Sequence, residues 1–330
     1  MVTLATNNPT LADVAKGLDP DGSVAQTIEI LNQQNEILLD ATFIEGNLPT
    51  GHRTSIRTGL PQPTWRKLYG GVQPTKSTKT QVTDNCGMLE DYAEVDKALA
   101  DLNGNTMSFR LSEDKAHIEG INQEVAQTMM YGNEGSAPAE FTGFSPRFNS
   151  LSAQNGDNII NAGGTGADNT SIWLVVWGPN TAHMIYPKGS KAGLSVDDKG
   201  QVTVENADGQ GGRMEAYRTH YKWDIGMTVR DWRFVSRICN IDVSDLNTVD
   251  NTKKLIDWMI QASERIPAFG MGRAAWYVNR NIREKLRLGI LNKTAYNLTW
   301  ETVAGQRVLM FDGIPVRRTD ALLNTESVVS

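Results

Sequence analysis

The stretch from Gly59 to Val82 constrains the fold more than any other, because its residues cannot be buried as one regular element. Two prolines bracket Gln62, and the pair Gly70–Gly71 interrupts the remainder. The halves on either side of this glycine pair, 64–69 and 75–82, are compatible with strands, but neither has a clean apolar face. The stretch therefore predicts a hairpin, turned at Gly70–Gly71, that projects from the body of the protein.

The charge of the first eighty residues is divided between two segments. Residues 1–50 carry seven acids and one lysine, whereas residues 51–80 carry six arginines and lysines and no acid. Adjacent segments of opposite charge favour pairing, within one chain or between copies of it, and two solvated faces are the alternative. The candidate contact residues are Arg53, Arg57, Trp65, Arg66, Lys67, Lys76 and Lys79 in the basic segment and Asp13, Asp19, Asp21, Glu29, Glu36 and Asp40 in the acidic segment.

Two kinds of partner fit a tryptophan in a basic hairpin. Trp65 could stack on a nucleobase, as aromatic residues do in single-strand binders. A single tryptophan is more typical of an anchor against a neighbouring protein surface. The net charge of −6 also argues against a protein whose main task is to coat nucleic acid.

The sequence shows no constellation of catalytic or metal-binding residues. The four histidines are isolated from one another, and Cys86 and Cys239 lack the spacing of metal ligands or of a redox pair. No motif of a zinc protease, a serine hydrolase or a phosphate-binding loop is present. We therefore expect no enzyme, no cofactor and no metal site. The sequence also lacks a secretory signal, and its most apolar short run, 172–177, is too brief to cross a membrane, so we expect a soluble product made in the cytosol.

Apolar periodicity predicts a mixed α and β chain of one large or two medium domains over 330 residues. Helical spacing predicts a long helix over 108–131, ended by Gly132. Residues 221–241 alternate over an unusual length and predict one long strand with a break at Asp231. The other expected elements are a helix over 23–40, strands over 171–178, 182–187 and 201–206, a helix over 251–267, a strand over 274–280, a helix over 279–289 ended by Gly289, and a hairpin over 308–318 turned at Asp312–Gly313.

The order of these elements resembles the major capsid proteins of tailed bacteriophages, which have the Hong Kong 97 (HK97-like) fold. Local strings look like the capsid proteins of short-tailed, podovirus-type phages, in the group around the Bordetella phage and the Epsilon15-like viruses. These strings are WGPNTAHMIYPKGSKAGL (177–194), WRFVSRICNIDVSDL (232–246), AAWYVNRNIREKL (274–286) and FDGIPVRRTDALL (311–323). The resemblance covers nearly the whole chain.

The resemblance implies an α+β capsid fold with named regions. These are an N-terminal arm over 1–45, a projecting E-loop hairpin over 46–85, a P-domain mainly over 86–248 with the spine helix 108–131 and the long strand 221–241, and a compact α/β A-domain mainly over 249–330 with a C-terminal return strand. The P and A regions interleave in this fold. In such proteins the E-loop lies over a neighbouring subunit and the arm extends along another.

The function that the resemblance implies is that of a structural subunit of an icosahedral viral head, present in the virion and assembled in the host cytoplasm. Subunits would self-assemble into hexamers and pentamers around packaged double-stranded DNA, without sequence-specific binding and without a membrane. The implied partners are other copies, a scaffold, a portal and a cementing or decoration protein. Some members of this fold join subunits covalently through an E-loop lysine, but no motif singles out such a lysine here, and we expect no cross-link. The alternatives are an encapsulin-type compartment shell, a soluble α/β enzyme, or a nucleic-acid binding module.

Overall fold

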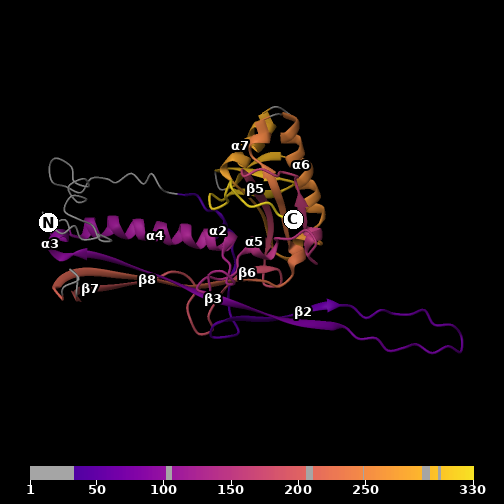
Figure 1. Ribbon diagram of the computed structural model, residues 1–330, viewed down its shortest axis with the longest axis horizontal. Helices are drawn as coiled ribbons and strands as arrows, with labels where there is room; N and C mark the ends of the chain where they lie inside the picture. The colour runs from indigo at the N-terminus through magenta and orange to yellow at the C-terminus, as the bar shows by residue number, and fades with distance from the viewer. Residues whose placement is uncertain (1–32, 102–105, 206–210, 248, 292–297, 304–305) are drawn as a thin grey trace. The chain divides into compact units, whose positions relative to one another are not determined.

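The computed structural model describes residues 33–101, 106–205, 211–247, 249–291, 298–303 and 306–330 (Figure 1). The described chain forms two compact units. One unit contains Met88–Val125 and Gly193–Asp224, and the other contains Gln34–Gly87, Ala126–Ala192 and Ile225–Ser330. The second, larger unit holds the main hydrophobic core.

Strand β5, Asn169–Trp177, is the centre of the larger unit. All nine of its residues are buried, as expected for a strand that is covered on both faces. It pairs antiparallel with β10, Arg273–Val278, along one edge and with β9, Val235–Asp242, along the other. Further strands of this unit's sheets are β1 Phe43–Glu45, β4 Ile159–Asn161, β6 Ala182–Tyr186, β11 Leu298–Val303, β12 Gln306–Phe311 and β13 Ile314–Arg318.

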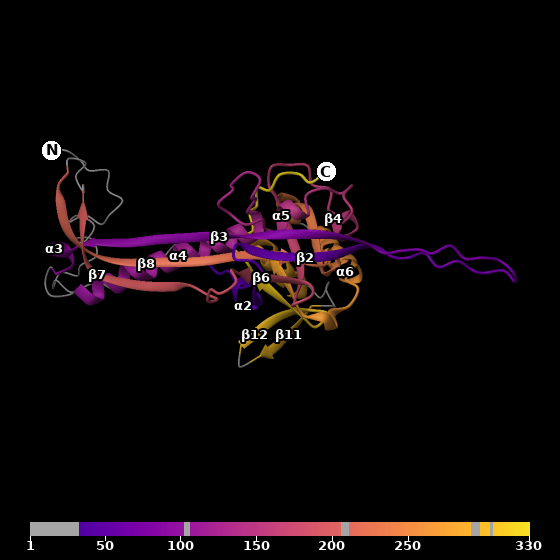
Figure 2. The same ribbon diagram turned by 90° about the horizontal axis from the view of Figure 1, so that it is seen from below.

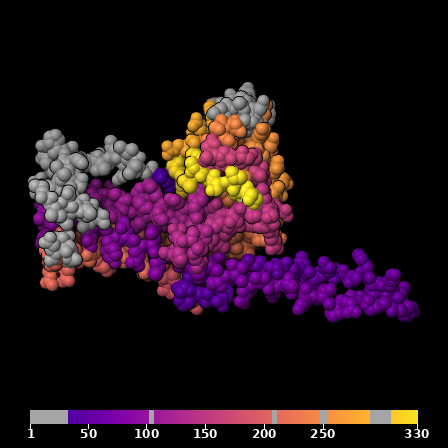
Figure 3. Space-filling model, viewed as in Figure 1, coloured from indigo at the N-terminus to yellow at the C-terminus, as the bar shows by residue number. Residues whose placement is uncertain are grey.

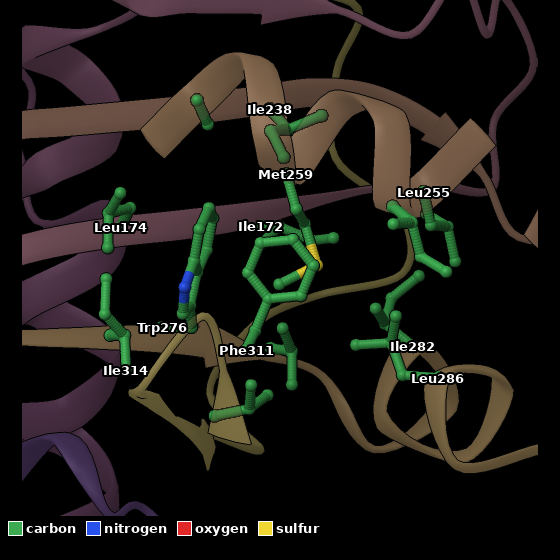
Figure 4. Close-up of a cluster of buried hydrophobic side chains, with 14 of the residues drawn as sticks. Ile172, Leu174, Ile238, Leu255, Met259, Trp276, Ile282, Leu286, Phe311 and Ile314 are labelled. Carbon is green, nitrogen blue, oxygen red and sulfur yellow. The ribbon is translucent and has the colours of Figure 1, made fainter. Parts of the chain in front are cut away.

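Two helices cover one face of this sheet. The helices are α6, Val249–Glu264, and α7, Arg280–Leu291. Figure 4 shows their apolar side chains meeting those of the strands: Leu255 and Met259 from α6, Ile282 and Leu286 from α7, Ile172 and Leu174 from β5, and Trp276, Phe311 and Ile314 from the neighbouring strands. The sequence predicted α6 and α7 correctly, but α7 continues through Gly289, which was expected to end it. A glycine lowers the stability of a helix interior but does not by itself end a helix.

Aromatic side chains cover the opposite face of β5. The rings of Phe144 and Phe148 lie 5.7 and 5.8 Å from that of Trp173, and Phe144 also packs edge-on against Trp177. Phe144 belongs to the short helix α5, Phe144–Arg147. Because alternate residues of a strand point to opposite faces, the odd-numbered residues of β5 meet these rings and the even-numbered ones meet the helices.

A buried ion pair fixes the C-terminal segment to this aromatic layer. Arg237 on β9 binds Glu326 at 2.8 Å, and their side chains are 2% and 4% exposed. The guanidinium also donates to Ser171 and to the Phe148 carbonyl and lies 5.0 Å from the centre of the Trp173 ring. Each of the three guanidinium nitrogens of Arg237 therefore donates to an acceptor, as a buried charge requires.

The smaller unit is built on long strands and one helix. Strand β7, Ser195–Glu205, pairs antiparallel with the first part of β8, Arg213–Val229, and β3, Thr78–Asp96, is followed by the short helix α3, Lys97–Ala100. Helix α4, Thr106–Tyr131, begins in this unit. Ion pairs connect these elements: Arg110 on α4 binds Asp198 on β7 at 2.6 Å, and Arg218 on β8 binds Glu94 on β3. Buried apolar side chains of this unit include Val95, Ile121 and Tyr221.

The predicted long helix is confirmed as α4. It ends at Tyr131, immediately before Gly132 as expected, and a Cβ at Gly132 would lie 2.5 Å from the Phe141 carbonyl oxygen. Of its apolar residues at helical spacing, Ile121, Val125 and Met129 are buried, whereas Leu111 is 57% exposed.

The hairpin at Asp312–Gly313 is confirmed, since both residues have positive φ angles, as a type I′ turn demands. The single strand expected over 221–241 is instead two strands, β8 and β9. The backbone leaves the ladder at Asp231, whose carboxylate caps the turn 232–234. Of the helix expected over 23–40, the described residues contain α2, Ile37–Asp40, and the rest of that prediction lies at residues outside them.

We expect Glu326→Ala to lower the free energy of unfolding by about 3 to 5 kcal/mol, because it leaves the Arg237 guanidinium buried and unpaired. Urea denaturation of the unassembled subunit measures this. The matched control is Glu205→Ala, which removes an ion pair whose side chains are 69% and 72% exposed and should cost no more than about 1 kcal/mol. Equal losses in the two variants would contradict a structural role for the buried pair.

Candidate functional site

The basic segment forms a long hairpin in the larger unit. Strand β2, Gly51–Gly59, pairs antiparallel with the start of β3, from Gly51 opposite Asn85 to Ile56 opposite Thr80. Figures 1 and 2 show β2 and the loop that follows it, residues 60–77, extending away from the sheet around β5. The predicted projecting hairpin is therefore present, with its strands nearer the body than the sequence indicated.

The loop 60–77 contains no strand, so the strand predicted over 64–69 is wrong. Pro61 and Pro63 on one side and Pro74 on the other lack the N–H groups that a ladder would need. The chain turns at Lys67–Gly70, where the Gly70 N–H donates to the Lys67 carbonyl at 3.0 Å, rather than at Gly70–Gly71. Tyr69 adopts a φ of 60° in this turn.

The loop presents large apolar side chains to solvent. Trp65 is 100% exposed and Tyr69 is 99% exposed. The further exposed members of this set, which we call the apolar tip, are Leu60, Leu68 and Val72. Figure 3 shows the loop uncovered by the rest of its unit on the face drawn. Trp65 was predicted from the sequence as a contact residue, but the other four were not. Their position among prolines and glycines, in a segment that cannot be buried, could have indicated that they are exposed.

The predicted basic residues differ in their surroundings. Arg53 donates from Nε to the Thr83 hydroxyl at 3.2 Å, and its backbone is held by Asn47. Arg57 lines a pocket of about 490 Å³ beside the hairpin, together with Arg230 and Asp231. Among the residues that the structure describes, no acid forms an ion pair with Arg57, Arg66, Lys67, Lys76 or Lys79, all of which are exposed. These side chains are available to a partner.

The predicted acidic residues fall into two groups. Asp13, Asp19, Asp21 and Glu29 lie outside the described residues. The Asp40 carboxylate is fully buried and accepts from Arg273 at 2.9 Å and from Arg317 at 3.0 Å, while Glu36 lies 3.4 Å from Arg317. Glu36 and Asp40 thus have partners inside the subunit, and their expected contact with another copy stays a prediction.

Two histidines lie at the base of the hairpin. His52 on β2 and His183 on β6 form an edge-to-face pair with ring centres 5.9 Å apart. Asp84, opposite His52 in the ladder, is buried and bound by Arg147 at 2.8 Å and by the Thr228 hydroxyl. Both ring nitrogens of His52 and Nε2 of His183 are buried without a hydrogen-bond partner among the described residues.

The environment of this pair favours neutral imidazoles. Burial lowers the pKa of His183 to about 4, and the nearby His52 and Arg230 act in the same direction. Burial, and then Arg230, also lower the pKa of His52, while Asp84 opposes the shift. The expectation that the histidines are isolated from one another is wrong for this pair, whose two members are 131 positions apart in the chain.

The described residues offer no group of three or more histidine, cysteine or acidic side chains arranged to hold a metal ion. None of the described helices is both long and apolar enough to cross a membrane.

The comparisons with known proteins agree with this architecture. The sequence matches the family described as "Major capsid protein GP7" over residues 19–330. The chain belongs to this capsid protein family. A comparison with curated protein sequences gives no match.

Two solved structures extend this result. A chain in the structure of bacteriophage Epsilon15 is 38% identical, with a TM-score of 0.80, and the match covers 100% of this chain and 99% of that one. The bacteriophage JBD30 capsid gives a TM-score of 0.50 at 10% identity, over 89% of this chain and 92% of that one, which indicates the same fold. The protein is therefore a major capsid protein with an HK97-like fold. It assembles with itself into the shell of a phage head, and its place in the virion is structural rather than enzymatic.

We expect the unassembled subunit to lose stability as the pH falls from about 6.5 to about 4. Folded His183 stays neutral across this window, whereas the unfolded chain takes up the proton, so the stability present above pH 6.5 is lost on approach to the folded pKa. The loss from this residue is on the order of 3 kcal/mol. Chemical denaturation at a series of pH values measures it, with His183→Gln as the comparison. Parallel pH profiles of the two proteins would contradict this origin.

Proposed function

We propose that the hairpin of β2 and β3 is the E-loop of this capsid protein and that its apolar tip binds a neighbouring copy of the same chain. The observation that carries this proposal is the exposure of Trp65 and Tyr69 in a segment that contributes nothing to the described core of its own subunit. Exposed apolar patches of this kind mark protein interfaces. Another copy is the partner to expect, because the protein forms a shell from copies of itself.

Apolar burial supplies the affinity in this proposal. An aromatic side chain buries about 150 to 250 Å² on docking, which corresponds to roughly 4 to 6 kcal/mol at about 25 cal/mol per Å². The ordering of a flexible loop and the loss of free motion offset part of this gain. An exposed ion pair contributes only about 0 to 1 kcal/mol. Trp65 and Tyr69 would therefore supply most of the affinity, and the surrounding charges would determine the register of the contact.

The basic side chains around the tip suit that second role. Arg66 and Lys67 directly follow Trp65 in the chain and are exposed without an ion-pair partner among the described residues. Complementary charge steers encounter and fixes register more than it raises affinity. An acidic segment of a neighbouring copy fits this surface, and the acids at Asp13, Asp19, Asp21 and Glu29 are the candidates from the N-terminal arm.

We propose the remaining correspondences on the same basis. Residues 1–45 are assigned to the N-terminal arm, 46–85 to the E-loop, 86–248 mainly to the P-domain with α4 as spine helix, and 249–330 mainly to the A-domain. Subunits in hexamers and pentamers would enclose double-stranded DNA, with a scaffold, a portal and a cementing protein as further partners. The net charge of −6 suits a container that holds its DNA without tight binding.

The double variant Arg66→Glu, Lys67→Glu should leave the subunit folded and soluble but block shell formation, because it reverses the charge beside the anchor. Electron microscopy and sedimentation of the assembling protein measure the yield of shells, and thermal unfolding of the unassembled subunit measures folding. The matched control is Lys188→Glu, Lys191→Glu, which changes the same charge at two exposed lysines outside the hairpin. Normal shells from the hairpin variant would refute the proposed contact.

We expect mature shells to be free of covalent links between subunits. No described acid forms an ion pair with Lys67, Lys76 or Lys79, and a cross-linking lysine needs a nearby buried acid as a base. Boiled particles should therefore run as a single band near 36.3 kDa on a denaturing gel. A ladder of multimers that survives boiling would overturn this expectation.

A further inference from the structure

Helix α7 carries a row of arginines on the side that faces away from the core. Ile282 and Leu286 point into the apolar cluster (Figure 4), whereas Arg280, Arg283 and Arg287 follow one another at spacings of three and four residues. These three arginines therefore lie along one helix face. With Arg318 of β13 and with Glu284 and Leu288, they line a pocket of about 360 Å³.

The pocket holds an excess of positive charge. Its lining contains four arginines and a single acid, in a protein whose net charge is −6. Burial lowers the pKa of Arg283, Glu36 opposes the shift, and repulsion from Arg287, Arg318 and Arg317 acts in the same direction as burial. The Nε–H of Arg283 is buried and has no acceptor among the described residues. A partly buried guanidinium that others crowd, and whose Nε–H has no acceptor, can accept a further anionic partner.

Two acids outside the lining, Asp320 and Glu36, already form ion pairs with these arginines. Asp320 lies 3.2 Å from Arg280 and accepts from Arg318 through both of its oxygens, and it also accepts the Gln34 backbone N–H at 3.1 Å. Glu36 is shared between Arg283 at 3.6 Å and Arg317 at 3.4 Å. These carboxylates position the arginines, and together with Glu284 they are three acids beside the four arginines of the lining and Arg317.

We propose that this arginine pocket binds a phosphate group. Guanidinium groups match phosphate oxygens in pairs of parallel hydrogen bonds, and several on a rigid helix hold them at fixed spacing. The pocket lies within the size range of small-ligand sites, and its concave shape suits a compact, doubly charged oxyanion better than an extended acidic peptide. Phosphate of this kind occurs in a nucleotide-like small molecule and in the backbone of DNA, so the source is decided by experiment.

Isothermal titration calorimetry of the purified, full-length subunit with inorganic pyrophosphate tests the proposal, at constant ionic strength. We expect saturable binding that weakens by at least about tenfold in the variant Arg280→Gln, Arg287→Gln. The control Lys188→Gln, Lys191→Gln removes the same charge elsewhere in the larger unit and should bind as the wild type does. Thermal unfolding of each variant without ligand identifies any loss caused by misfolding. A milder variant, Arg287→Lys, keeps the charge but not the paired donors and should also bind more weakly.

Competition experiments distinguish the two sources. A short DNA duplex that displaces pyrophosphate from the wild type, but binds the pocket variant more weakly, would support the DNA backbone as the source. Failure of the duplex to compete would support a small phosphate compound. Absence of pyrophosphate binding to the wild type, or equal binding by the pocket variant, would overturn the proposal. So would a peptide of residues 10–32 that binds the pocket while pyrophosphate does not, since the site would then serve an acidic protein segment.

Discussion

The burial of β5 on both faces is the constraint on which the larger unit depends. A strand with nine buried residues must find apolar cover on two sides at once. Helices α6 and α7 provide one cover, and Phe144 and Phe148 provide the other. The second cover brings Arg237 beneath the aromatic rings, and its buried charge in turn requires Glu326 from the C-terminal segment. The burial of both faces of β5 thus brings together segments that are far apart in the sequence.

The two histidines at the base of the hairpin lie between this core and the projecting part of the hairpin. On one side of them, β6 and β8 continue the packed sheet, and Asp84 is satisfied by Arg147 and Thr228. On the other side, β2 and β3 lose their apolar cover and continue as a two-stranded ribbon. A ribbon of two strands is at best marginally stable alone, so its base must be held firmly. The contact between the rings of His52 and His183, together with the bonds of Asp84 to Arg147 and Thr228, fixes the base of the ribbon to the sheet.

Short sequence patterns predicted the helices and turns that depend on residues close together in the chain. The spacing of apolar residues was sufficient for α4 and α6, and Asp312–Gly313 was sufficient for its turn, because each depends on neighbours in sequence. The same patterns did not predict features that depend on contacts between residues far apart in the chain. The position of Gly289 inside α7, the burial of Asp40 by Arg273 and Arg317, and the arginine pocket all depend on residues brought together by the fold. The hairpin was predicted correctly. The strand predicted over 64–69 is absent, because Pro61, Pro63 and Pro74 lack the backbone N–H groups that a strand ladder needs.

The loop 60–77 is attached to the core only through the strands that carry it. Its closure entropy grows slowly with length, so that doubling the loop would cost only about 0.6 kcal/mol. Insertions, deletions and exchanges in this loop therefore leave the packing around β5 unchanged. In the proposed contact between copies, such changes would alter how far one subunit extends over the next, and with it the spacing and curvature of a shell, without a change in the fold that the shell is made from.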